Sequence, residues 1–198
     1  EQKIEDPGRH FIACLEDGVL AGYISLNPPQ EKPFRITTYF SKETLDQTVY
    51  AECSHRLNST FEVRALTVNP NFRGLNISFR LMRYALEFIL ERDGTDIVAM
   101  GHSGVAELYR KNGMTVFDEH GVLHGETLYY PMYLNPLTVM KEHAQRIDDD
   151  IASEEEDDVC YHGGKSWDTS KFDFEVRDSL VVADVLDSPF PPCPEALE

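Results

Sequence analysis

The sequence predicts an α/β domain of the α+β type, and three observations support this fold class. Two apolar runs within residues 10–26 flank Asp17-Gly18, a dipeptide typical of two-residue hairpin turns. Residues 61–91 read as an apolar strand followed by an amphipathic helix, and residues 96–113 repeat that order. Strands and helices that follow one another in this way indicate a sheet with helices packed on it.

The first element is a hairpin with strands at His10 to Leu15 and Val19 to Leu26, and the prolines that follow end it. Residues 34–60 show a weaker secondary-structure pattern. Within them, Ser41 to Thr44 resembles a helix start with Ser41 as the N-cap residue.

The next unit is a strand from Phe61 to Val68, a loop from Asn69 to Ser78 and a helix to about Glu91. The apolar residues of this helix recur at helical spacing: Ile77, Leu81, Met82, Ala85, Leu86 and Ile89. A strand–loop–helix unit points backbone N–H groups and a helix N-terminus at one place, which suits a diphosphate. Arg73 adds a fixed positive charge beside that place.

The last unit begins with a strand from Asp96 to Met100, and a helix follows it. Gly113 fits the end of that helix, because glycine adopts the left-handed conformation of a C-terminal cap. The residues from Val122 to Leu134 form two short strand-like runs, and a further helical stretch begins after Pro136.

Two of these segments resemble motifs of the GCN5-related N-acyltransferase superfamily. Asn69 to Ser78 resembles its acyl-CoA loop, and Glu107 to Met114 resembles its Tyr-x-x-x-Gly-Phe helix end with Met114 in place of Phe. The resemblance covers roughly residues 8–137 and implies a mixed central sheet flanked by helices. Asn76 and Ser78 stand where the family has two small residues, so a strand–helix turn without a ligand stays open as the alternative.

Within the superfamily, the hairpin strand from His10 to Leu15 and the strand from Phe61 to Val68 resemble the acyl-homoserine-lactone synthases and N-acyl amino acid synthases. The strand of those enzymes commonly carries Glu, two residues, then Arg. Glu62 is present, but Ala65 occupies the Arg position. The resemblance therefore leaves the acceptor amine open.

The implied function is N-acyl transfer from acyl-CoA or acyl carrier protein to a small-molecule amine. The implied catalytic residues are Glu62, as the base for the amine, and Tyr109, as the acid for the departing thiolate. The alternatives are an ion pair of Glu62 with Arg64 or Arg56, and simple core packing of Tyr109. The implied donor-binding residues are Leu66, Thr67, Val68, Arg73, Gly74, Leu75, Asn76, Ile77 and Ser78. A non-catalytic binding or regulatory module with the same fold is the alternative function.

Composition limits the partners. The formal net charge is −17, and eight acidic residues between 148 and 158 supply nearly half of it. Such a surface disfavours nucleic acid. No stretch has the length and hydrophobicity of a membrane span, and the four cysteines show no CxxC spacing, so we expect a cytoplasmic protein. His120 and His124 are spaced like metal ligands but lack a third partner at fixed spacing, so we expect no metal site.

The expected organisation has three parts: an acyltransferase domain over 1–140, a helix and acidic linker over 141–165, and an extended C-terminal tail over 166–198. The chain enters its first strand almost at once, whereas the family that it resembles normally places a helix before this hairpin, so the resemblance implies that the front of the chain is truncated. Within the tail, Val176 to Pro192 resembles the lead-in to a fold-type I pyridoxal-phosphate aminotransferase, which would make a fused downstream enzyme domain the partner. The alternative is a tail that packs on its own domain.

Overall fold

The computed structural model describes residues 2–5, 8–31, 33–73, 77–141 and 172–182. Its strands, in chain order, are β1 (Gln2–Glu5), β2 (His10–Glu16), β3 (Val19–Asn27), β4 (Thr60–Val68), β5 (Asp96–His102), β6 (Thr115–Val116), β7 (Val122–His124), β8 (Thr127–Leu134), β9 (Phe172–Arg177) and β10 (Ser179–Val182). Its α-helices are α1 (Lys42–Gln47), α2 (Val49–Cys53), α3 (Ile77–Leu90) and α4 (Ser103–Lys111), with a further helix at 136–141. Its 3₁₀ helices are η1 (Arg35–Thr38), η2 (Ser54–Ser59), η3 (Pro70–Phe72) and η4 (Asp118–His120).

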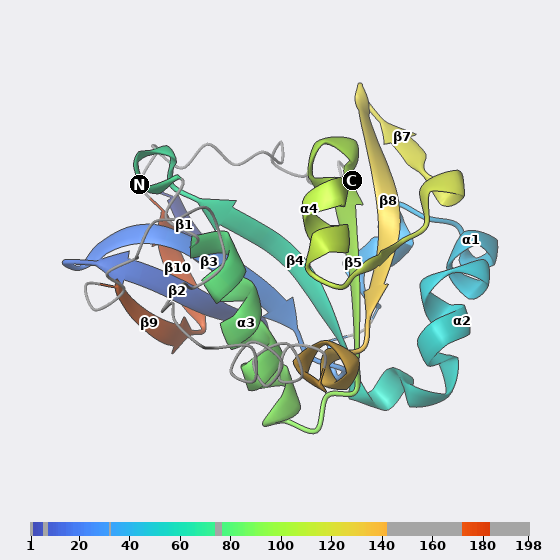
Figure 1. Cartoon of the computed structure of the whole chain (residues 1–198), viewed down its shortest axis with the longest axis horizontal. Coiled ribbons are helices and arrows are strands. Elements are labelled where there is room, and N and C mark those ends of the chain that lie inside the picture. The colour runs from blue at the N-terminus through green and yellow to red at the C-terminus, as the bar shows by residue number, and fades with distance from the viewer. Residues whose placement is uncertain (1, 6–7, 32, 74–76, 142–171, 183–198) are drawn as a thin grey trace, which may run out of the picture.

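One large sheet organises the domain, with the strand order β6-β8-β5-β4-β3-β2-β9 and β7 paired to β8 (Figure 1). Only β4 and β5 run parallel, and the other neighbouring strands are antiparallel. This confirms the mixed sheet with flanking helices. No described helix is long and apolar enough to cross a membrane.

The hairpin prediction is confirmed by β2 and β3. Asp17 and Gly18 at its tip have φ values of 50° and 76°. A two-residue turn with both φ values positive matches the right-handed twist of the strands, which explains the Asp-Gly pair. The predicted cap at Ser41 is also confirmed, because its side chain accepts a hydrogen bond from the N–H of Thr44 at 3.1 Å.

The two faces of the sheet carry separate cores. On one face, α3 packs against β2, β3 and β4, and its buried residues Ile77, Leu81, Ala85 and Ile89 belong to the main apolar cluster, as does Tyr109 of α4. On the other face, η1, α1 and α2 supply a second cluster that includes Phe34, Ile36 and Leu45. In Figure 1, α3 lies in front of the sheet, and α1 and α2 lie at its right.

Residues from the C-terminal region complete the edge of the sheet. β9 pairs with β2, so that Phe11 stands opposite Arg177, and β10 pairs with β1 in a separate two-stranded sheet. Phe174 stacks on Tyr84 of α3 at 4.4 Å, and the guanidinium of Arg80 lies 4.9 Å from the same ring. Residues 172–182 therefore pack on the same domain as β2 and α3, while the rest of the expected linker and tail lies outside the described residues. The aminotransferase resemblance of the tail stays a prediction.

Candidate active site

The site begins where β4 and β5 separate. Their ladder consists of four pairs, from Thr60 with Asp96 to Val63 with Ala99, although both strands continue beyond it. β4 also carries a bulge: Val63 and Ala65 pair with the consecutive residues Leu26 and Ser25, which leaves Arg64 as the extra residue. A bulge bends its strand and increases the local twist. The bulge therefore accounts for the divergence of β4 from β5 just beyond Val63.

An apolar pocket fills the space between α3 and α4 on one side of this fork. The strands contribute Val63, Leu66 and Ala99, and the two helices close its sides. The helical and neighbouring residues of its wall include Phe79, Met82, Leu86, Tyr109, Met114 and Val139. A concave and mostly apolar site of this kind suits a small-molecule ligand with an apolar portion.

Tyr109 is the residue of this pocket that the sequence analysis proposed as a proton donor. It lies in α4, and the residue is 8% exposed. A Cβ atom on Gly101 would lie 3.0 Å from Cε2 of Tyr109, so the absence of a side chain at Gly101 allows the ring to rest on β5. Burial raises the pKa of Tyr109 to about 12. Its hydroxyl is therefore protonated at neutral pH and can serve as a proton donor.

Glu62 lies on the opposite face of the sheet. Its Oε1 accepts a hydrogen bond from the N–H of Ile36 at 2.7 Å, and its Oε2 accepts one from the N–H of Arg35 at 2.9 Å. The Nδ2 of Asn27 also donates to Oε2 at 2.9 Å. The carboxylate thus binds the N-terminus of η1, where helical N–H groups lack partners within the helix.

The surroundings of Glu62 influence its pKa in two directions. Burial raises the pKa of this carboxyl group, because only 2% of the residue is exposed, and the three donated hydrogen bonds oppose the rise. The net effect is a pKa above the usual value for Glu. Arg56, one of the two ion-pair partners considered for Glu62, binds Asp96 through two nitrogens.

The predicted donor loop is partly described. Leu66 lines the pocket, Thr67 is buried, and Val68 ends β4 with its side chain against the main core. Arg73 follows η3 as an exposed residue. Ile77 is the buried first residue of α3, and Ser78 beside it is half-buried. Gly74, Leu75 and Asn76 lie outside the described residues.

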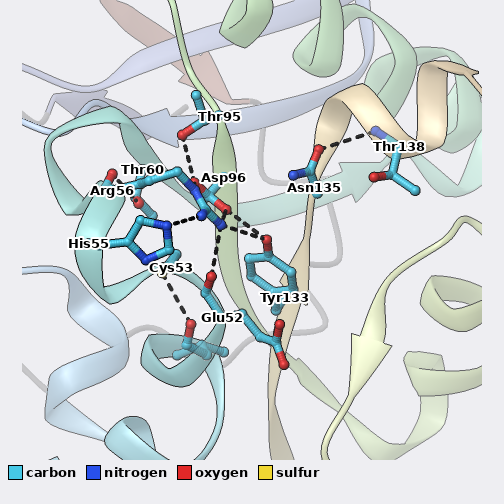
Figure 2. A network of polar contacts seen from close by, with 11 residues as sticks. Glu52, Cys53, His55, Arg56, Thr60, Thr95, Asp96, Tyr133, Asn135 and Thr138 are labelled. Atoms are coloured by element: carbon cyan, nitrogen blue, oxygen red, sulfur yellow. Dashed lines mark hydrogen bonds and ion pairs between the residues drawn. The ribbon is translucent and has the colours of Figure 1, made fainter.

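The fork is fixed at its closed end by a polar network that the sequence analysis did not identify (Figure 2). Asp96 is fully buried at the first β4–β5 pair and accepts hydrogen bonds from Arg56 at 2.6 and 2.8 Å. Thr95 Oγ1 and Tyr133 Oη also donate to it, at 2.6 and 2.7 Å. Burial disfavours the charged form, but these bonds outweigh it and hold the pKa of Asp96 below its usual value.

One of the histidines, His102, has a local structural role. His102 is the N-cap of α4, and its Nδ1 accepts a hydrogen bond from the N–H of Gly104 at 3.1 Å. Burial lowers the pKa of His102, which favours its neutral form. Among the described residues, no group of three or more His, Cys, Asp or Glu side chains has a metal-binding arrangement.

The chain was compared with models of protein families and with solved structures, and both comparisons found similar proteins. The family model described as the Acetyltransferase (GNAT) family matches residues 1–114. Among solved structures, the CoA-dependent acyl-homoserine lactone synthase BjaI, with SAM and isopentyl-CoA, is 15% identical and aligns over 72% of this chain with a TM-score of 0.52. The alignment spans 66% of the length of that synthase, and the likeness shows a shared fold.

A second similar structure is FeeM, an N-acyl amino acid synthase from uncultured soil microbes. It is 15% identical, with a TM-score of 0.48, and the alignment covers 68% of this chain and 71% of that one. No curated protein sequence matches the chain.

Proposed function

Because the chain belongs to the acetyltransferase (GNAT) family and is therefore an N-acyltransferase, we propose that it transfers an acyl group from acyl-CoA to a small-molecule amine at the β4–β5 fork. The observation that carries this proposal is the apolar pocket at the fork, which holds Tyr109 in its wall. In this proposal the acyl chain of the donor occupies the pocket, and the thioester lies at the point where the strands separate.

The donor phosphates are assigned to the loop between β4 and α3. Arg73 is exposed there, and the N-terminus of α3 offers backbone N–H groups and the positive end of the helix dipole. The residues of β4 from Leu66 to Val68 form no ladder pair with β5. An N–H near Val68 is therefore a candidate donor for the thioester oxygen.

The two proton-transfer residues face opposite sides of the sheet, so the amine would approach from the η1 side and the donor from the α3–α4 side. The amine nitrogen attacks the thioester carbonyl carbon, a C–N bond forms, and the C–S bond breaks. Glu62 receives the amine proton through a water molecule, because its carboxylate is almost fully buried. The departing thiolate takes the proton of the Tyr109 hydroxyl.

Acyl-CoA is the preferred donor over acyl carrier protein on electrostatic grounds. The chain has a formal net charge of −17, which would repel an acidic carrier protein unless a local basic patch compensated for it. The exposed Arg73 provides a charge for a phosphate but not an extended basic surface.

The proposal is tested by mixing the protein with octanoyl-CoA and a panel of primary amines and amino acids. Free CoA thiol is followed with a thiol reagent, and the N-acyl product is identified by mass spectrometry. We expect CoA release that depends on the amine. Acyl-CoA binding by calorimetry without release for any amine would instead support the non-catalytic module, and the absence of binding by acetyl-CoA and octanoyl-CoA would refute the assigned donor site.

A further inference from the structure

The pocket at the fork contains every methionine of the chain. The sequence has five methionines, and Met82, Met100, Met114, Met132 and Met140 all line this one cavity. The wall comprises 21 of 198 residues, so random placement would bring fewer than one of the five to it. By contrast, of the leucines in the described part of the chain only Leu66, Leu86 and Leu134 line the pocket, although leucine is also apolar.

These methionines come from separate parts of the fold. Met82 belongs to α3, Met100 to β5 and Met132 to β8, while Met114 follows α4 and Met140 lies in the helix at 136–141. Met114 and Met132 are buried, and the other three are half-buried. The concentration therefore reflects the cavity rather than one methionine-rich segment.

Two glycines make room for this wall. A Cβ atom on Gly101 would lie 2.8 Å from Cε of Met132, and one on Gly113 would lie 2.7 Å from Cγ2 of Val139. The first approach lets Met132 lie against β5. The close approach of Val139 to Gly113 brings the helix that carries Met140 against the end of α4. Gly113 has a φ of +85° there, a conformation that favours glycine.

Methionine gives a binding surface different properties from leucine or isoleucine. Its side chain is unbranched, with three rotatable bonds and a polarisable sulfur, so it refills space around ligands of different shape. A rigid apolar pocket discriminates roughly 10- to 200-fold for each methylene that is added or removed. A wall that rearranges reduces that penalty.

We propose that this pocket binds flexible acyl chains longer than acetyl and accepts a range of their lengths, with the five methionines as the residues that determine this tolerance. The inference rests on the proposed function and names its donor class. An acetyl group has a single methyl carbon beyond its carbonyl and would leave most of the methionine wall without contacts. A longer chain would replace that empty space with dispersion contacts.

The first experiment uses the methionine methyl groups as reporters. Protein labelled with ¹³C at the methionine methyls gives five signals, all from the pocket, and single Met→Leu variants assign them. Butyryl-, hexanoyl-, octanoyl- and decanoyl-CoA should each shift these signals relative to CoA alone, and by amounts that change with chain length. Acetyl-CoA should leave them close to their positions with CoA.

The second experiment measures kcat/KM across the same donors with one accepted amine. In the native protein we expect less than about a tenfold change for each two-carbon step. The double variant Met82→Leu/Met100→Leu conserves apolar volume but removes flexibility, so its profile should sharpen to a narrow optimum. Leu45→Met, the reverse exchange in the second core and outside the pocket wall, should leave the profile unchanged.

The outcomes separate this inference from the proposed function. Turnover of acetyl-CoA alone, or a sharp optimum at one length in the native protein, would keep the proposed function and overturn the inference. A flat profile that persists in the double variant would overturn the role of the methionines. If no acyl-CoA, including acetyl-CoA, binds or reacts, both fail together.

Discussion

Glu62 and Val63 are consecutive residues of β4 whose side chains reach opposite faces of the sheet. Val63 lines the apolar pocket between α3 and α4, while Glu62 binds the amide groups of Arg35 and Ile36 on the η1 side. The β4–β5 ladder ends at Val63, so this pair of residues stands at the point where the sheet opens. A donor and an acceptor that approach from opposite faces would meet there.

Tyr109→Phe tests the proton donor. The ring and its packing survive, but the hydroxyl that would protonate the thiolate is lost. We expect kcat to fall about 10- to 1000-fold with a nearly constant KM, the pattern of a group that acts in the transition state. Tyr84→Phe, on the exposed side of α3, is the control and should retain full activity. Equal turnover of both variants would reduce Tyr109 to a packing residue.

Glu62→Gln tests the base through the pH dependence of activity. If Glu62 accepts the amine proton, activity should rise with pH through its elevated pKa, and the amide should remove this acidic limb together with most of the rate. The measurement is the pH–rate profile, normalised to folded protein by circular dichroism. An unchanged profile per folded molecule would assign Glu62 to structure alone. If the rate of the Glu62→Gln variant recovers fully at high pH, the amine loses its proton in solution and Glu62 is not the base.

The same variant has a predictable effect on stability. All three partners of Glu62 are N–H donors, so the Gln amide nitrogen would face a donor, and we expect a loss of about 1–3 kcal/mol in the free energy of unfolding. The folded pKa of Glu62 is raised, so its contribution to stability is fully present below the unfolded value of about 4.3 and is lost as pH rises through the folded value. Urea unfolding between pH 4 and pH 8 should show that this dependence disappears in the variant.

Asp96 should govern stability at the acidic end. Its folded pKa is lowered, so its contribution is present above the unfolded value of about 3.9 and is lost as pH falls through the folded value. Asp96→Ala leaves the guanidinium of Arg56 without its buried partner (Figure 2), and we expect a loss of about 3–5 kcal/mol. Asp46→Ala breaks the exposed pair with Lys42 and should cost less than about 1 kcal/mol in the same urea titration.

Arg73→Ala tests the assigned phosphate position. Removal of a charge-assisted hydrogen bond to phosphate should weaken acyl-CoA binding by about 1–3 kcal/mol in calorimetry. Arg92→Ala removes an equal charge just beyond the opposite end of α3, where its guanidinium lies 3.5 Å from the ring centre of Phe88, and should leave affinity unchanged. An equal loss of acyl-CoA affinity in the two variants would indicate that Arg73 acts through long-range electrostatic attraction and not through direct contact with a phosphate.

The elements of the domain were largely predictable from local patterns. The Asp17-Gly18 turn, the Ser41 cap and the apolar periodicity from Ile77 to Ile89 each depend on residues close together in the sequence, and each matches the structure. The motif around Tyr109 likewise indicated a helix that ends near Gly113.

The surroundings of the site could not be predicted in the same way, because they join residues that are far apart. Glu62 meets the N–H of Ile36 across 26 residues, and Arg56 meets Asp96 across 40. The five methionines carry no common spacing, so only the folded chain reveals that they share a wall. The predicted roles of Glu62 and Tyr109 stay predictions until the variants are measured.

The pairing of β9 with β2 has a consequence for how this protein must be synthesised. Ile12 and Val176 are partners in that ladder although 164 residues separate them, so the outer edge of β2 stays open during synthesis until residue 176 has left the ribosome. An exposed strand edge is a template for pairing with another chain, and contacts this distant in sequence form slowly. A recombinant version that ends at residue 140 would keep that edge permanently open, so we expect it to aggregate although it retains both proposed catalytic residues.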